Sequence, residues 1–189
     1  MTNADRIRLH ELIYARASLL EAAAIAEELS HGRYPATVTS ALIAAMAVAY
    51  YRPFMGSRRP DGTKVAQIEE QLALELDKDT HLNLKRFRHE ACAHKDLSPR
   101  TMNIPIVKMH SNGALDIHSL LPVAIDPEEC ARIQNLCTRI VEVLVGQTGA
   151  LLKGVKMPAA GTYTLNHEEG DWLVPLDQRS LDRANLDRE

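Results

Sequence analysis

The first thirty residues carry apolar side chains at intervals of three or four, the spacing that places them on one face of a helix. These positions are Leu9, Ile13, Ala17, Leu20 and Ala24. They predict a long helix over about residues 4–30 that buries this stripe, and Gly32 supplies its stop. A second helix is expected from Pro35, because residues 41–51 form an apolar run that other elements must enclose. Pro53 should end or kink it.

Two more helices are expected before residue 100. Apolar residues recur helically over residues 64–76, which predicts a short helix. Asp79 or Thr80 can cap a following helix that runs to about His94.

The pattern then changes to the alternation of strands. Residues 103–122 contain two such runs around the turn pair Asn112 and Gly113, which predicts a small hairpin. Asp126 can then cap a last helix, with Pro127 in its first turn. Beyond Gly154 the chain could form either a second hairpin or an extended arm.

The predicted fold is mainly α. Aromatic residues make up only 4% of the sequence while alanine and leucine are abundant, a composition that suits close helix packing. We expect a helical bundle of about five helices with a β-hairpin insertion. Residues 1–157 would form the bundle, and residues 158–189 an extended C-terminal arm with a charged tail.

Charge and cysteine usage narrow the possible binding surfaces and the expected cellular compartment. The net charge of −3 excludes a protein coated in basic surface, so any nucleic-acid contact must come from a local patch. The three cysteines form no CxxC pair, and the N-terminus lacks an apolar signal-peptide core, so we expect a cytoplasmic protein. Residues 41–51 are too short to span a membrane, which needs about 20 apolar residues.

One segment gathers the side chains that could carry chemistry. Residues 85–96 contain four basic side chains and two histidines. Arginine can grip a phosphate bidentately, and histidine can both take and give protons near neutral pH. Arginine and histidine side chains can cleave RNA without a metal or cofactor. A base activates the ribose 2′-hydroxyl, an acid protonates the leaving oxygen, and a cation neutralises the phosphate.

Arg88, the polar His89 beside it, and His94 followed by Lys95 resemble the motif of the HEPN superfamily. That motif is an arginine, usually a polar residue next, and a histidine after four to six intervening positions. The family's members are helical bundles that typically pair as homodimers, and many are metal-independent RNases of toxin-antitoxin or phage-defence systems. The resemblance implies that Arg88 and His94 are catalytic, and His89 matches the polar position of its motif. We expect Lys85, His89 and Lys95, in the same basic segment, to contact RNA. The resemblance also implies an antitoxin or another regulatory protein as partner.

Helix geometry bears on this assignment. Six residues along an ideal helix place Arg88 and His94 about 120° apart and about 9 Å along the axis, so they cannot form a tight pair on one straight helix. Either the helix unwinds near Ala93, or the site combines residues from two subunits, as the resemblance implies.

Other interpretations remain open at this point. His94 continues an apolar stripe and could be a hydrogen-bonded histidine at the edge of the core, and the basic residues could be a solvated helix face. The chain could then be a non-catalytic bundle that binds a partner protein or a nucleotide. A metal-dependent hydrolase is a third alternative, with its candidate ligands among His81, His89, Cys92 and His94. Cys130 and Cys137 lie seven residues apart on an apolar helix face and are expected to be packing residues.

Overall fold

A computed structural model describes most of the chain. The described residues are 1–58, 62, 64–89, 104–109, 115–120, 125–156, 163–165 and 172–175. Within them the protein is mainly helical, as its composition predicts. No helix in these ranges is long and apolar enough to cross a membrane.

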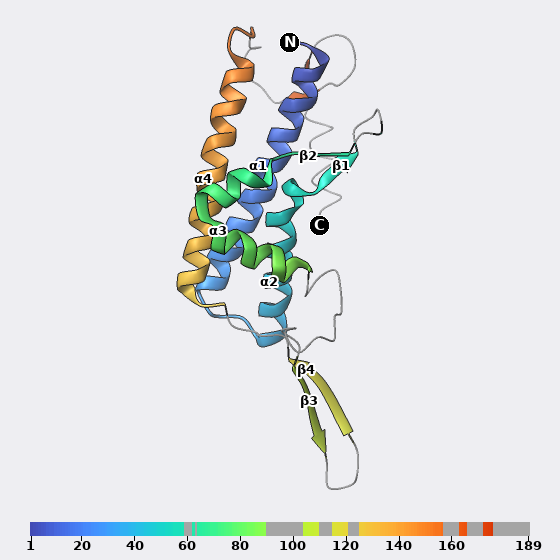
Figure 1. The fold of residues 1–189 in the computed structure, drawn as a ribbon, viewed down its shortest axis with the longest axis vertical. Coiled ribbons are helices and arrows are strands. Elements are labelled where there is room, and N and C mark those ends of the chain that lie inside the picture. Colours follow the sequence, from blue (N-terminus) through green and yellow to red (C-terminus); the bar gives the residue numbers. More distant parts are fainter. Residues whose placement is uncertain are drawn as a thin grey trace. The chain divides into compact units, whose positions relative to one another are not determined.

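The helices carry most of the described residues (Figure 1). They are α1 (Asn3–Ser30), α2 (Ala36–Tyr51), the 3-10 helix η1 (Arg52–Phe54), α3 (Glu70–Phe87) and α4 (Pro127–Leu152). In the part of the chain that the structure describes, the strands form three separate antiparallel pairs, β1 with β2, β3 with β4 and β5 with β6. Their bounds are Gly56–Arg58, Lys64–Ala66, Ile104–Met109, Leu115–Leu120, Tyr163–Leu165 and Leu173–Pro175.

The chain divides into two compact units. The first comprises residues 1–14 and 144–189, in which Arg8 of α1 donates a 3.4 Å hydrogen bond to Gln147 of α4. The second comprises residues 15–143 and holds every described residue of the candidate site.

Helix α1 ends where glycine permits it, because Gly32 follows with a positive φ of 63°. The face that α1 buries differs from the predicted one. Leu19 is completely buried, whereas its neighbour Leu20 is 47% exposed and Ile13 is 43% exposed. The buried apolar residues are Leu9, Leu12, Ala15, Leu19, Ala22, Ala26 and Leu29, so only Leu9 of the predicted stripe is buried. The prediction was wrong because α1 carries apolar residues at helical spacing on two faces, and spacing alone does not say which one packs.

Helix α2 is likewise only partly enclosed. Met46 and Tyr50 are buried, but Val48 is 39% exposed, so the expectation that residues 41–51 are fully enclosed was wrong. Small residues dominate α2, and α3 packs against it, yet part of the α2 surface is left exposed. After Tyr51 the chain tightens into η1, which contains Pro53.

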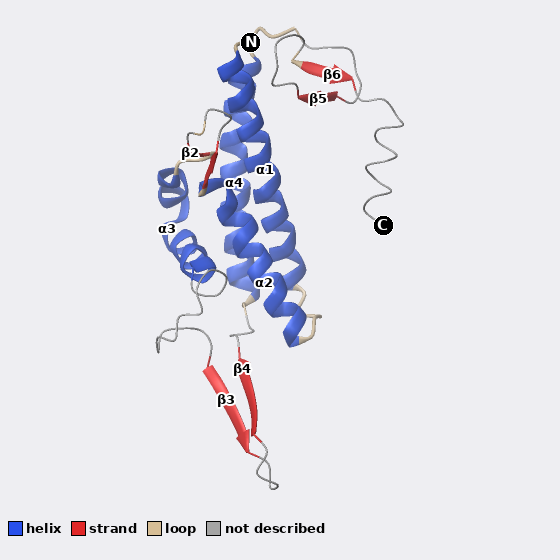
Figure 2. Cartoon of the chain, turned by 90° about the vertical axis from the view of Figure 1, so that its right-hand side faces the viewer, coloured by secondary structure: helices blue, strands red, loops and turns tan. Residues whose placement is uncertain are grey.

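Helix α3 is broken at Asp77, whose φ of −159° and ψ of 92° are extended rather than helical. Asp77 caps the second piece: its Oδ1 accepts from the Thr80 N–H at 3.1 Å and its Oδ2 from the Thr80 hydroxyl at 2.7 Å. Figure 2 shows the two pieces meeting at an angle. The sequence predicted this cap at Asp79 or Thr80, whereas the structure has it at Asp77. Residues 64–66, expected to be helical, form strand β2.

Helix α4 begins as predicted, because the Asp126 carboxylate accepts a 2.6 Å hydrogen bond from the Glu129 N–H. Cys130 and Cys137 are buried on its packed face, which confirms that they are packing residues. Burial raises the pKa of both thiols, that of Cys137 to about 12. The Arg139 guanidinium donates to the Leu76 carbonyl at 2.9 Å and so ties α4 to the end of the first piece of α3.

Candidate site at the junction of α2 and α3

Two adjacent tyrosines end α2, and both are buried. They are held there by aromatic neighbours: Phe54 of η1 lies with its ring centre 5.4 Å from that of Tyr50 and 5.8 Å from that of Tyr51. A buried tyrosine hydroxyl requires a hydrogen-bond partner. Tyr50 finds it in the second piece of α3.

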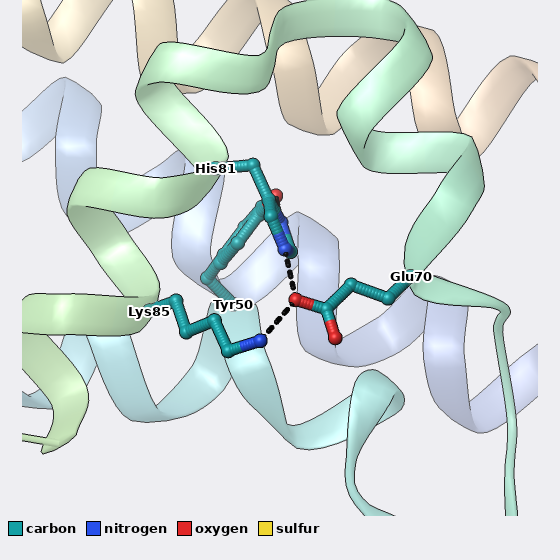
Figure 3. A network of polar contacts seen from close by, with 4 residues as sticks. All are labelled: Tyr50, Glu70, His81 and Lys85. Carbon is teal, nitrogen blue, oxygen red and sulfur yellow. Dashed lines mark hydrogen bonds and ion pairs between the residues drawn. The ribbon is translucent and has the colours of Figure 1, made fainter.

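His81 supplies that partner and is itself completely buried. Its Nδ1 lies 2.8 Å from the Tyr50 hydroxyl, and its Nε2 lies 2.8 Å from Oε1 of Glu70 (Figure 3). A carboxylate only accepts hydrogen bonds, so Nε2 carries the proton; in the neutral ring Nδ1 then accepts from Tyr50. Burial also raises the pKa of Tyr50, which keeps its hydroxyl a donor.

Glu70 has a second partner, the cation of Lys85. The Lys85 ammonium lies 2.6 Å from the same oxygen, Oε1, that accepts from His81 (Figure 3). The hydrogen bonds from His81 and Lys85 lower the pKa of Glu70, and Glu70 in turn raises the pKa of Lys85. Glu70 and Lys85 are therefore both charged at neutral pH. Their side chains are 34% and 35% exposed, so the pair itself contributes only about 0–1 kcal/mol to stability.

The basic residues of α3 gather around Tyr51. The Lys85 ammonium and the Arg88 guanidinium carbon each lie 6.0 Å from the centre of its ring. The His89 ring lies 6.3 Å away. We call Tyr51, Lys85, Arg88 and His89 the Tyr51 cluster. It places the cations of Lys85 and Arg88 at one ring at the end of α3, where Lys85 and Arg88 are partly exposed and His89 is exposed.

The structure brings together three of the residues that the sequence predicted for the site, Lys85, Arg88 and His89. His94 and Lys95 lie outside the described residues. Four other residues of the site, Tyr50, Tyr51, Glu70 and His81, were missed by sequence reasoning about RNA. The sequence signal that could have found this network is the pair of tyrosines at the end of an apolar helix, because a buried tyrosine hydroxyl needs a hydrogen-bond partner.

The structure also bears on metal binding. Both ring nitrogens of His81 already have protein partners, which leaves no lone pair free for an ion. Among the described residues, no three His, Cys, Asp or Glu side chains are grouped so that they could hold a metal ion. Cys92 and His94, two of the ligands considered from sequence, lie outside those residues.

The Tyr51 cluster has the chemistry of an anion site. Arginine presents a planar fork of donors to phosphate, lysine a mobile point charge, and histidine a ring N–H donor. Comparison of the chain with protein-family models, with curated proteins and with solved structures finds no match. Any function must therefore be argued from this cluster and from the sequence motif.

Proposed function

We propose that this protein is a metal-independent endoribonuclease that cleaves RNA by attack of the ribose 2′-hydroxyl on the adjacent phosphate. The observation that carries the proposal is the position of Arg88: it ends α3 beside Lys85, with both cations at the Tyr51 ring. The spacing of Arg88 and His94 in the sequence, which resembles the HEPN motif, supports it.

The proposed roles follow from the side chains. Arg88 neutralises the phosphate as it gains negative charge, which needs a permanent cation with several donors. His94 transfers protons, a step that contributes about 10² to 10⁴ in rate in enzymes of this kind. Lys85, His89 and Lys95 hold neighbouring parts of the RNA. DNA lacks the attacking hydroxyl and would not be cut.

A homodimer is part of this proposal. On one straight helix Arg88 and His94 would point about 120° apart, so a site composed from two chains satisfies the geometry. In the second unit, apolar side chains that a partner could cover are exposed on α1 and α2, among them Leu20, Val38 and Val48. Light scattering coupled to size-exclusion chromatography tests it, and a mass of about 21 kDa at micromolar concentration would contradict it.

The experiment incubates purified protein with mixed-sequence RNA in EDTA. Wild type is compared with His94→Ala and Arg88→Ala, and with Arg86→Ala as matched control, because Arg86 is an exposed cation on the same turn as Arg88. We expect cleavage by wild type and by Arg86→Ala, leaving 2′,3′-cyclic phosphate ends. Loss of one catalytic group should slow it by about 10² or more.

Unchanged cleavage by His94→Ala would contradict the assignment of the proton-transfer residue. Ends carrying 3′-hydroxyl groups would contradict 2′-hydroxyl attack. If no form cleaves any RNA tested, the catalytic proposal is abandoned in favour of the second candidate.

The second candidate is a non-catalytic helical bundle that binds a partner protein. It is favoured by the same exposed apolar residues of α1 and α2, Leu20, Val38 and Val48, which a partner protein could cover. In the toxin setting that the motif resemblance implies, that partner would be an antitoxin. The candidate predicts stable co-purification of a protein partner and no RNase activity, and loss of the partner in a Leu20→Glu variant.

A further inference from the structure

Glu70 joins two partners that differ in their access to water. Its Oε1 accepts from His81, whose side chain is completely buried, and from Lys85, whose side chain is 35% exposed. One oxygen therefore links the interior of the junction between α2 and α3 to its surface (Figure 3).

The two contacts are not equally easy to break. If Glu70 withdrew from His81, a buried N–H would lose its acceptor with no water to replace it, which is costly. If Lys85 withdrew from Glu70, its ammonium would exchange a half-exposed ion pair for water or another anion, which costs little. His81 thus holds Glu70 in place, and Lys85 is the partner that can leave.

Lys85 and Arg88 are three residues apart at the end of α3, a spacing that makes side chains neighbours on a helix, so an RNA phosphate bound at Arg88 would lie within reach of Lys85. Both cations are 6.0 Å from the centre of the Tyr51 ring, and lysine places its charge at the end of a flexible four-carbon stem. We propose that, in the RNA-free protein, the Glu70 carboxylate takes the position of a phosphate on Lys85. When RNA binds, Lys85 transfers to the phosphate, so Glu70 limits the affinity of the site. This inference rests on the proposed RNA-binding function.

The test measures binding of a fluorescein-labelled 2′-O-methyl RNA 20-mer, which cannot be cleaved by 2′-hydroxyl attack, by anisotropy over a series of salt concentrations. The variants are Glu70→Gln, Lys85→Ala and the double variant. Glu75→Gln is the matched control, because it removes the same charge from an exposed glutamate on the same piece of α3. The amide oxygen that Glu70→Gln introduces can still accept from His81, and circular dichroism checks that each variant is folded.

We expect Glu70→Gln to tighten binding about fivefold, the equivalent of one exposed ion pair, and Glu75→Gln to change it less than about twofold. The log–log slope of affinity against salt should change by less than about 0.7, the value for one phosphate contact on a single strand, because Lys85 contacts the phosphate in both wild type and Glu70→Gln. In the Lys85→Ala background the gain from Glu70→Gln should vanish, because the released cation is absent.

Three results would overturn the inference. Weaker binding by folded Glu70→Gln would show that Glu70 supports the site instead of competing for it. An equal gain from Glu75→Gln, or a gain that persists without Lys85, would show that only overall charge matters. Absence of RNA binding by every form, Glu70→Gln included, would overturn the RNA proposal itself and this inference with it, whereas the first two results would leave the RNA proposal standing.

Discussion

Replacing Tyr50 with phenylalanine should lower the free energy of unfolding by about 1–3 kcal/mol. The substitution removes one oxygen and leaves the ring in place against Phe54. The lost hydroxyl is the partner of His81 Nδ1 at 2.8 Å, and the His81 side chain has no exposed surface. The expected cost is therefore that of a buried acceptor left without a donor, not that of a cavity.

The assay is urea denaturation followed by circular dichroism at 222 nm, with the midpoint and slope fitted together. Tyr34→Phe is the matched control, because the Tyr34 hydroxyl donates at 2.7 Å to Glu28, whose side chain is 45% exposed. Water can replace that bond, so the control should change stability by less than about 0.5 kcal/mol.

A Tyr50→Phe variant as stable as Tyr34→Phe would refute the reasoning, because it would mean that His81 Nδ1 does not depend on this hydroxyl. A loss well above about 3 kcal/mol would also count against it, since a single neutral hydrogen bond cannot account for that much.

Three further predictions address the rest of the second unit. Leu19→Ala should cost about 2–5 kcal/mol while Leu20→Ala costs less than about 0.5 kcal/mol, because only Leu19 is buried; equal losses in urea denaturation would mean the wrong face is assigned. Asp126→Ala should lower stability by about 0.5–2 kcal/mol through loss of the α4 cap, and an unchanged midpoint would argue against that cap. In a Cys92→Ser variant, Cys130 and Cys137 should react with Ellman's reagent at pH 8 only after denaturant is added, because both thiols are buried and their pKa values are raised; fast reaction of the native protein would contradict this.

The ends of helices were predictable where a glycine, a proline or an aspartate acts directly on the neighbouring backbone. Gly32 follows α1 with a positive φ, Pro53 lies in the 3-10 turn after α2, and Asp126 caps α4. In each case the signal and its effect lie within four residues of one another, so no distant contact is needed to interpret it.

The break in α3 was only partly predictable. A boundary near residue 78 was expected, yet Asp77, Asp79 and Thr80 are all acceptable caps, and the pattern does not choose among them. The contacts between the two pieces of α3 favour Asp77 as the cap. With the cap at Asp77, Glu70 on the first piece reaches His81 and Lys85 on the second.

The sequence by itself determined the helical class, the residues near which α1 and α2 end and α4 begins, and the concentration of basic residues near the end of α3, because these depend on local propensity and spacing. Only the tertiary structure decided that Leu19 rather than Leu20 faces the core, since α1 offers two apolar faces and packing selects one. It alone joined Tyr50, Glu70 and His81 into one network, because residues far apart in the chain meet only when α3 folds against α2.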